Sequence, residues 1–243
     1  MDATTIQRLN AINREFYRVT ADEFDQTRGT AWPGWEKLLP YLNRKPNGTT
    51  FSVLDVGCGN GRFGVFLAEH VGRELDYHGM DNNGALLERA MQAVSAAPGV
   101  ATTLERRDVV EDPPDSGLYD LVAVFGVIHH IPGCRQRQEF IRMLAKRVKP
   151  GGVLALACWR FYEFDRFRSR IIPWGDDLRD VVENHDYLLD WRRGEVALRY
   201  CHYVDDAEHA ALLKASGLDE IVTYRADGFT GTVNQYSILV RLD

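Results

Sequence analysis

An acid followed by glycines at alternate positions is the stretch of this 243-residue chain best suited to bind a ligand. In the run FSVLDVGCGNGRFG, a short apolar segment ends at Asp55 and gives way to Gly57, Gly59 and Gly61. Glycine lets the backbone turn sharply, and because it has no Cβ a ligand can lie against the chain. A helix predicted over residues 62–70 would direct its free N–H groups at that ligand. The run therefore predicts a buried strand, a ligand-binding turn and the start of a helix.

Two nucleosidic ligands fit such a turn. Gly59, Gly61 and Gly64 also satisfy the dinucleotide pattern G-x-G-x-x-G, which is a weak signal when it stands alone. Asp55 separates the two ligands, because its carboxylate lies two residues before the first glycine. There it would repel a pyrophosphate but could receive the cationic amino group of S-adenosylmethionine (AdoMet). Charge matching therefore favours AdoMet over a nicotinamide dinucleotide.

Two further acids end the next apolar runs. Asp81 follows residues 75–80 and lies about 20 residues beyond the glycine turn, the distance at which an acid meets ribose hydroxyls. Asp108 follows residues 101–107 and is placed to reach the adenine amino group, with Val109 against the ring. Ligands bind at the carboxyl edge of such sheets, so we expect these acids to share one nucleoside site.

Residues before and between the strands complete the predicted cofactor site. Arg28 is expected to pair with the methionine carboxylate, while Tyr17 and Trp32 close over the methyl group. An ordinary amphipathic layer, with a surface arginine and core aromatic residues, explains these three residues equally well. The remaining predicted contacts come from the glycine turn and the ends of neighbouring strands: Cys58, Asn60, Asn82, Phe125, Gly126 and Val127.

Paired histidines follow the fourth predicted strand. His129 and His130 could act as an acid or a base or bind a metal, but adjacent side chains point apart and packing is the simpler interpretation. The spacing of His202, Asp205 and His209 likewise fixes no ligand geometry, so we predict no metal site.

Strands and helices alternate from Phe51 to Cys158. This alternation predicts an α/β fold with a Rossmann-like, doubly wound and mostly parallel sheet. Two later strands, over residues 221–224 and 236–242, are expected to form an antiparallel pair at the edge of that sheet. We expect the whole chain, residues 1–243, to form a single domain.

The N-terminal residues 1–45 form a predicted helical cap. Apolar residues at helical spacing predict one helix over residues 4–19, and Thr20 is the candidate N-cap of a second helix over residues 21–26. A third helix is expected to begin at Pro33, because proline suits the first helical position.

Residues 159–198 form a predicted lid inserted over the active site. The segment is rich in aromatic residues and arginine and shows little strand alternation. Residues 159–170 contain four arginines and two acids, a modest basic patch whose rings could stack on bases. Six acids follow between residues 176 and 190, so a solvated surface is an equal alternative.

The composition describes an ordinary soluble globular chain, with 45% hydrophobic and 26% charged residues. Neither an apolar run of about eighteen residues nor an apolar leader is present, so we expect a cytoplasmic protein that does not enter a membrane. Four cysteines lie far apart without a C-x-x-C pair, which argues against a zinc site and a disulfide framework. A net charge of −6 disfavours broad nucleic-acid binding but leaves room for RNA held by a local patch.

The glycine turn, the three acids, the fourth strand and Lys149-Pro150-Gly151-Gly152 together resemble the class I AdoMet-dependent methyltransferases. This resemblance implies AdoMet as methyl donor and S-adenosylhomocysteine (AdoHcy) as product. Shorter motifs outside the cofactor site resemble the tRNA methyltransferases that esterify the carboxymethyl group of the wobble uridine. Those motifs are Thr27-Arg28-x-x-Ala31-Trp32-Pro33, His129-His130, Cys158-Trp159, Ile172-Pro173-Trp174 and Arg199-Tyr200-x-His202.

The nearer resemblance implies a carboxylate acceptor in the anticodon region of a tRNA. Arg199 would clamp that carboxylate, while Tyr200, His202 and Trp159 would shape the base pocket. A carboxylate is already ionised at neutral pH, so its methylation needs in-line placement and a dry pocket but no general base. Eukaryotic members of this family use a small zinc-binding protein as an activating subunit.

Two other functions fit the same residues. Net acidity and the aromatic lid favour a small-molecule O-methyltransferase acting on a carboxylate or a phenol. A non-catalytic AdoMet-binding subunit is the remaining alternative.

Overall fold

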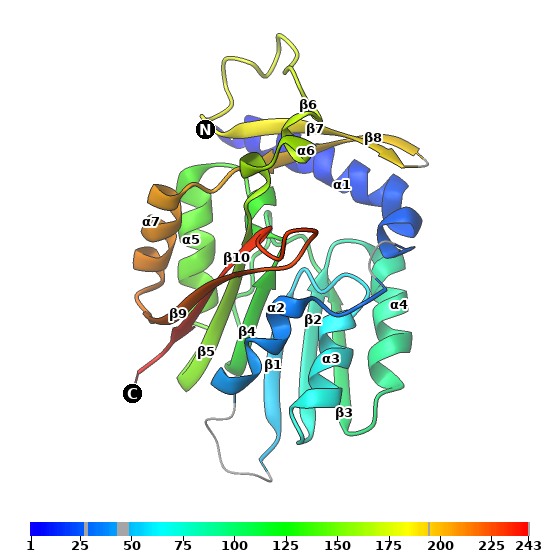
Figure 1. The fold of residues 1–243 in the computed structure, drawn as a ribbon, viewed down its shortest axis with the longest axis vertical. Coiled ribbons are helices and arrows are strands. Elements are labelled where there is room, and N and C mark those ends of the chain that lie inside the picture. The colour runs from blue at the N-terminus through cyan, green and yellow to red at the C-terminus, as the bar shows by residue number, and fades with distance from the viewer. Residues whose placement is uncertain (27–28, 43–48, 194, 243) are drawn as a thin grey trace.

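The computed structural model describes residues 1–26, 29–42, 49–193 and 195–242, and its centre is a seven-stranded sheet (Figure 1). The strands lie in the order β3-β2-β1-β4-β5-β10-β9. Strands β1 to β5 run parallel to their neighbours within this group, while β10 is antiparallel to β5 and β9. This arrangement confirms the predicted doubly wound sheet with an antiparallel edge. The bounds are β1 Phe51–Val56, β2 Leu75–Asp81, β3 Val100–Arg106, β4 Tyr119–Phe125, β5 Val148–Trp159, β9 Asp219–Ala226 and β10 Asn234–Val240.

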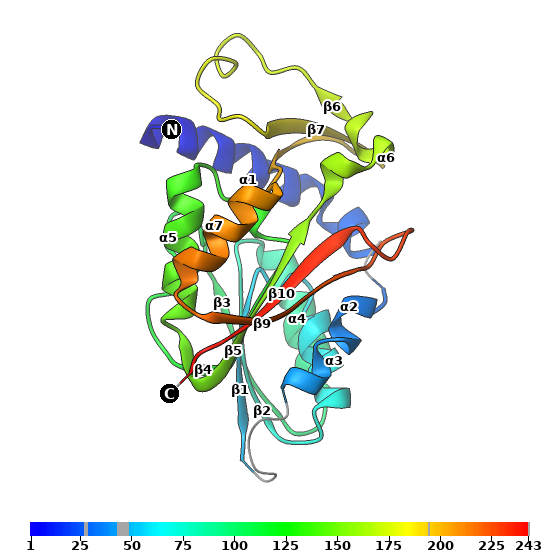
Figure 2. The same cartoon turned by 60° about the vertical axis from the view of Figure 1, so that its left-hand side comes forward.

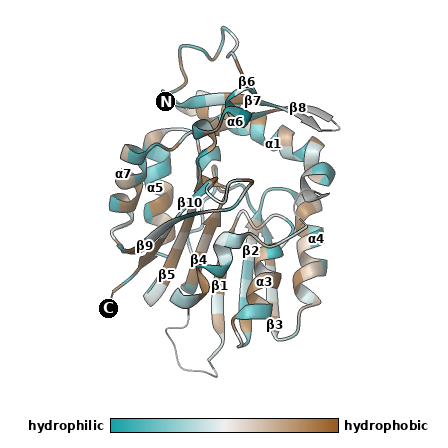
Figure 3. Cartoon of the chain, in the orientation of Figure 1, coloured by the Kyte–Doolittle hydropathy of each residue, from teal (hydrophilic) through white to brown (hydrophobic). Residues whose placement is uncertain are grey.

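Helices cover both faces of the sheet (Figure 2). Successive side chains of a strand point to opposite faces, so Val53 packs with Phe63 of one helical layer and Leu54 packs with Phe140 of the other. A strand covered on both faces has no polar side, which explains the apolar runs of the central strands (Figure 3). One layer holds α3 (Arg62–His70) and α4 (Gly84–Ser95), and the other holds α5 (Cys134–Ala145) and α7 (Asp206–Ser216).

The N-terminal cap begins with one long helix, α1 (Ala3–Gln26). It runs through Thr20, whose hydroxyl donates to the carbonyl of Phe16 at 2.8 Å. The prediction of two helices is therefore wrong, because Thr20 satisfies its hydroxyl on the preceding turn and does not cap a new helix. Helix α2 (Pro33–Glu36) begins at the predicted proline, and the 3₁₀ turn η1 (Leu39–Tyr41) follows.

The segment predicted as a lid contains a second, three-stranded antiparallel sheet. Its strands are β6 (Ile171–Ile172), β7 (Asp186–Arg193) and β8 (Glu195–His202), preceded by η3 (Phe161–Glu163) and α6 (Asp165–Arg168). The expectation of little strand structure is wrong, because arginine and aromatic side chains take the places that a simple alternation of apolar and polar residues would fill. This sheet lies above the carboxyl ends of the parallel strands, and α1 packs against β8 (Figure 1).

None of the described helices combines the length and the apolar character needed to cross a bilayer. The turn η2 (Ile128–His130) follows β4 and carries the paired histidines to the same carboxyl edge.

Candidate active site

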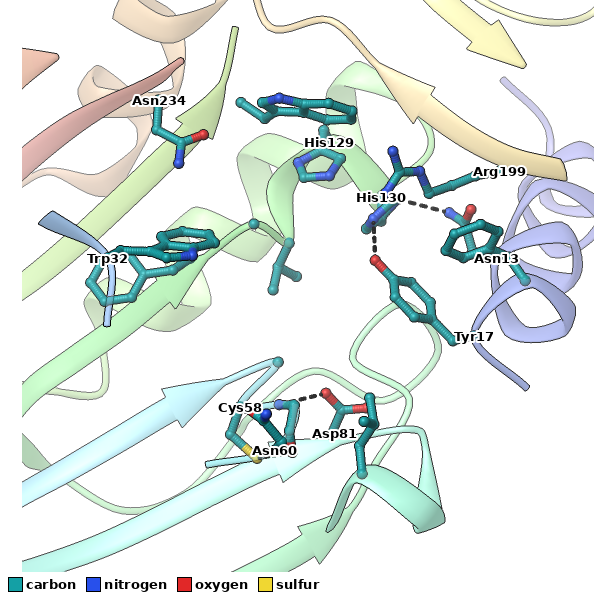
Figure 4. A pocket seen from close by; sticks show the side chains of 18 of the residues that line it. Asn13, Tyr17, Trp32, Cys58, Asn60, Asp81, His129, His130, Arg199 and Asn234 are labelled. Atoms are coloured by element: carbon teal, nitrogen blue, oxygen red, sulfur yellow. Dashed lines mark hydrogen bonds between the residues drawn. The ribbon is translucent and has the colours of Figure 1, made fainter. Parts of the chain in front are cut away.

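A cavity of about 590 Å³ lies between the carboxyl ends of the parallel strands and the lid sheet. We call its lower part in Figure 4 the glycine end, made of residues 57–60 with the acids Asp55, Asp81 and Asp108. The upper part, where Figure 4 labels Arg199 and Asn234, is the arginine end, and it also includes Phe16 and Trp159, whose rings lie beside Arg199. Arg28 lies outside the described residues. The other predicted cofactor residues all line the cavity: Tyr17, Trp32, Asp55, Gly57, Cys58, Gly59, Asn60, Asp81, Asn82, Asp108, Val109, Phe125, Gly126 and Val127.

The turn after β1 brings bare backbone to the cavity. Gly57 and Gly59 have φ angles of +73° and +55°, in the left-handed region that favours glycine. A Cβ on Gly57 would lie 2.3 Å from Cγ2 of Val127, whereas one on Gly59 would meet no atom within 4 Å. The backbone N–H of Gly59 donates to Asp81 at 2.9 Å and ties the turn to the end of β2. A side chain at Gly57 would therefore clash with Val127, whereas the backbone at Gly59 is open to the cavity.

Three acids surround this turn in different environments. Asp55 is buried and accepts the Tyr77 hydroxyl at 2.6 Å, and burial raises the pKa of its carboxyl group to about 7. Burial also raises the pKa of Asp81, although the backbone N–H groups of Asn83 and Gly59 oppose that shift. Asp108 accepts the side-chain amide of Asn10 at 2.9 Å. A bound cation next to Asp55 would favour its ionised form.

Aromatic residues wall one side of the cavity. Trp32 stacks on Trp35, with ring centroids 5.5 Å apart, and a Cβ on Gly126 would lie 3.5 Å from the Trp32 ring. The backbone after β4 therefore passes close to the Trp32 ring. The guanidinium of Arg62 lies 5.8 Å from the centroid of the same indole.

Tyr17 and the paired histidines lie between the two ends. The Tyr17 hydroxyl is 2.9 Å from Nε2 of His130, and Nδ1 of His130 is 3.0 Å from the carbonyl oxygen of Tyr200. Contacts at both nitrogens hold this ring in place. His129 is also buried, and its ring centroid is 5.3 Å from that of Trp159. Both histidine rings therefore pack against neighbouring aromatic residues, and both also line the cavity.

Arg199 is held at the arginine end by two aromatic rings. Its guanidinium lies 4.8 Å from the centroid of Trp159 and 5.1 Å from that of Phe16. Within the described part of the chain, no acidic side chain forms an ion pair with Arg199. Stacked rings fix the plane of a guanidinium without using its N–H donors. One donor can reach the thiol of Cys201, and the others are left to bind an anion in the cavity.

Tyr200 and His202 require a correction, because their side chains do not line the cavity. Successive residues of β8 point to opposite sides, so Arg199 faces the cavity and its neighbour Tyr200 faces away. The Tyr200 hydroxyl donates to Asp186 at 2.8 Å, and the ring of His202 lies between Asp186 and Glu208 at 2.7 and 2.5 Å. They shape the lid from behind and cannot contact an acceptor. Trp159 alone among the three predicted pocket residues reaches the cavity.

The network behind β8 joins the lid to α5 and α7. Arg137, 1% exposed, donates to Glu208 at 2.6 Å and to Glu183 at 3.1 Å. Burial opposes the charged form of His202, but hydrogen bonds that the ring donates to Asp186 and Glu208 outweigh it and raise the pKa of the ring. Glu183, Asp186 and His202 lie close enough to share a cation, and the guanidinium of Arg137 already supplies one.

The sequence does not predict Phe16 as a residue of this site, nor the two polar residues Asn234 and Asp227. Asn234 begins β10 directly opposite Trp159, and Asp227 lies beneath it in the preceding turn. The dipeptide Asp227-Gly228 predicts a turn, but it does not indicate that the turn lies beside the cavity.

Comparisons with known proteins give a consistent result. Residues 54–154 match a family model described as a methyltransferase domain. The chain is 30% identical over 188 residues to a putative methyltransferase of Encephalitozoon cuniculi, and the match covers 77% of each chain. The crystal structure of an S-adenosylmethionine-dependent methyltransferase from Clostridium acetobutylicum is similar in fold, with a TM-score of 0.63 at 13% identity over 95% of this chain and 99% of that one.

Two relatives carry a more specific name, tRNA (carboxymethyluridine(34)-5-O)-methyltransferase. The mouse protein ALKBH8 is 28% identical over 188 residues, which are 72% of this chain and 25% of that protein. The Saccharomyces cerevisiae protein is 25% identical over 166 residues, 65% of this chain and 54% of that one. The matches therefore span about a quarter and about half of these two relatives.

Proposed function

Because this chain belongs to the S-adenosylmethionine-dependent methyltransferases, we propose that it transfers the methyl group of AdoMet to a carboxylate. The proposed acceptor is the carboxymethyl group on the wobble uridine of a tRNA, whose anticodon region is then the partner. The chain is an enzyme and AdoMet is its cofactor, so the proposal concerns the acceptor and the roles of individual residues.

The glycine end suits AdoMet in charge and in shape. We assign the ammonium group to Asp55, the ribose hydroxyls to Asp81, and the adenine to Asp108 and Val109. The open side of Gly59 leaves room for the ligand where any side chain would project. A dinucleotide would bring its pyrophosphate against the carboxylate of Asp55.

The observation that carries the carboxylate acceptor is the position of Arg199. Its guanidinium faces the cavity between the rings of Trp159 and Phe16, and among the described residues no acid pairs with it. Arginine presents parallel N–H donors that match the two oxygens of a carboxylate. An anion bound there lies in the same cavity as the glycine end, so donor and acceptor can meet.

Methylation of a carboxylate needs little from the protein beyond placement. AdoMet held at the glycine end would supply an electrophilic methyl group, and its transfer from sulfur to the carboxylate oxygen would give the ester and AdoHcy. No proton moves in this step, so Arg199 has only to hold the carboxylate in line and the rings have only to exclude water.

An RNA acceptor agrees with the rest of the arginine end. Arg166 and Arg170 of the lid line the same cavity, and Arg166 stacks over Phe229 at 4.9 Å. This local charge offsets the net charge of −6, which is unfavourable for RNA elsewhere on the surface. Two relatives are named for the same chemistry on uridine 34.

Transfer of a labelled methyl group from AdoMet to an anticodon stem-loop tests the proposal. The stem-loop carries 5-carboxymethyluridine at the wobble position, and the same RNA with plain uridine is the matched control. We expect a methyl ester on the first RNA alone. Cells that lack the gene should also lose the methyl ester from their tRNA nucleosides, as measured by mass spectrometry. An inert stem-loop together with unchanged nucleosides would overturn the proposal.

One observation favours a second candidate, methylation of a small phenol. A phenol must lose its proton during transfer, and the contact of 2.9 Å between Tyr17 and Nε2 of His130 offers a route to an imidazole. A panel of phenols and small carboxylates assayed beside the stem-loop separates the two. Turnover of phenols alone, lost on His130→Gln, would favour this candidate.

A further inference from the structure

A nearly buried amide projects into the arginine end beside Trp159. Asn234, the first residue of β10, is 7% exposed and pairs with Trp159 across the β5–β10 ladder. Residues directly opposite in an antiparallel pair point to the same face, so the carboxamide and the indole share one wall. Figure 4 shows the carboxamide pointing into the cavity on the same side as His129 and Arg199.

Asp227 determines which way this amide is turned. Its Oδ2 accepts Nδ2 of Asn234 at 2.8 Å and the Tyr236 hydroxyl at 2.6 Å, while Oδ1 accepts the backbone N–H of Gly34 at 2.7 Å. A carboxylate that collects three donors only accepts hydrogen bonds, so the NH₂ group of Asn234 must face it. The oxygen of the amide is consequently the atom turned away from Asp227.

Asp227 itself is held in a costly conformation. It is 5% exposed and has a φ of +67°, which is unusual for a residue with a side chain. Its side chain accepts one hydrogen bond from Gly34 of α2 and two from β10, donated by Asn234 and Tyr236, and together they hold it in place. The orientation of Asn234 is therefore rigid.

The oxygen of this amide is a hydrogen-bond acceptor awaiting a donor. Among the described residues no group donates to Oδ1 of Asn234. This oxygen is not among the fully buried polar atoms that lack a partner, so it is open to the cavity, where a ligand can donate to it. The site thus selects for a ligand with an N–H or O–H at its edge.

We propose that Oδ1 of Asn234 accepts the N3–H of the uracil ring and so determines the base that this enzyme methylates. This inference rests on the proposed function. Arg199 would hold the carboxylate on C5 while Asn234 holds a different edge of the ring, and two such contacts fix a flat ring in its plane. Cytosine has a lone pair at N3, which would face the amide oxygen without a proton between them.

Two stem-loops that differ in one base test the inference. One carries 5-carboxymethyluridine and the other 5-carboxymethylcytidine at the wobble position, and kcat/KM is measured for both. We expect the wild-type enzyme to prefer the uridine by at least about tenfold, the discrimination typical of a good polar contact to a base. In Asn234→Ala the preference should fall to about twofold or less, chiefly because the uridine becomes a poorer substrate.

Controls separate loss of recognition from loss of fold. AdoHcy should bind Asn234→Ala within about twofold of the wild type, since the glycine end is untouched. Asn60→Ala, at the glycine end of the same cavity, should slow both RNAs alike and leave the preference unchanged. If Asn234→Ala does not fold, Asn234→Ser carries the same expectation, because its hydroxyl can still donate to Asp227.

The outcomes distinguish the two proposals. If the wild type methylates neither RNA, the proposed function fails and this inference fails with it. If it methylates both equally, or if Asn234→Ala keeps the preference, the inference is overturned while the carboxylate acceptor stands.

Discussion

The two ends of the cavity are built by different means. The glycine end is mostly backbone and strand-end acids, and Asp55 with its turn spans seven consecutive residues. The arginine end gathers side chains from four elements that are far apart in sequence, with Phe16 from α1, Trp159 from β5, Arg199 from β8 and Asn234 from β10. The first end depends on local chain geometry and the second on tertiary packing.

This difference suggests a division of labour between the ends. A cofactor that never changes can be held by backbone and by acids that any sheet of this kind offers at its carboxyl edge. An acceptor that differs between enzymes has to be recognised by side chains, which can change without disturbing the sheet. Substitutions at the glycine end should therefore slow transfer to every acceptor alike, and those at the arginine end should affect the acceptor alone.

The largest effect is expected from Asp55→Asn. The substitution removes the charge that we assign to the ammonium of AdoMet, so the Kd for AdoHcy should rise on the order of 1,000-fold. Isothermal titration calorimetry measures this change. Wild-type affinity in the variant would show that the acid at the end of β1 does not hold the cofactor.

Thermal unfolding separates lost binding from lost folding in this variant. Burial raises the pKa of Asp55 to about 7, far above the usual value of an aspartate, so its contribution to stability is present at low pH and is lost as the pH rises through 7. The unliganded Asp55→Asn protein should therefore melt at or above the wild-type temperature at pH 8, and the difference should shrink toward pH 4. A variant that melts lower at pH 8 would contradict this account.

Arg199→Met should produce the next largest effect, confined to the acceptor. Methionine keeps an unbranched apolar stem but removes the guanidinium that lies against Trp159 and Phe16, so kcat/KM for the carboxymethyluridine stem-loop should fall about 100-fold. AdoHcy should bind within about twofold of the wild type. The matched control is Arg142→Met, an exposed arginine of α5 outside the cavity, which should leave both quantities unchanged.

The same comparison explains what the sequence could and could not predict. The strand, the positive-φ glycines and the strand-end acids are local features, and each predicted cofactor residue among the described ones lies at the cavity. Asn234 could not be found in this way. It faces the cavity only because of its register with Trp159 and the left-handed turn at Asp227, and both are set by tertiary packing.

Two other predictions are wrong, the roles of Tyr200 and His202 and the lack of strands in the lid, and both concern local structure and not tertiary packing. Tyr200 and His202 were grouped with Arg199 as one motif, although a strand sends neighbouring side chains to opposite faces. The lid strands do not show the usual alternation of apolar and polar residues. Leu189 of β7 faces Arg199 of β8, because the long stem of an arginine can fill a place that an apolar side chain usually takes.

A smaller effect is expected from pH acting on the glycine end. The groups that face Asp55 are Tyr77, Asp81 and Arg62, and its pKa of about 7 reflects burial first. Only the ionised carboxylate attracts an ammonium, so the Kd of AdoHcy should rise about tenfold from pH 8 to pH 6. Calorimetry across this range gives the slope, and Asp55→Asn should flatten it. If the Kd of AdoHcy still rises toward low pH in Asp55→Asn, the titrating group is Asp81, whose pKa is also raised.

The smallest effect, and the sharpest test of the arginine end, should come from Asp227→Asn. Asparagine tolerates the φ of +67° at this position, so the turn is kept while the carboxylate becomes an amide that can also donate. Its NH₂ group can then bond to Oδ1 of Asn234, which allows part of the population to present NH₂ to the cavity instead. The preference for carboxymethyluridine over carboxymethylcytidine should therefore fall by about threefold to fivefold, the size of one neutral hydrogen bond. Asp219→Asn, an exposed change at the start of β9, the strand that ends one residue before Asp227, should leave the ratio unaltered. A ratio that survives Asp227→Asn would mean that the amide is oriented by the ladder with β5 and not by the acid beneath it.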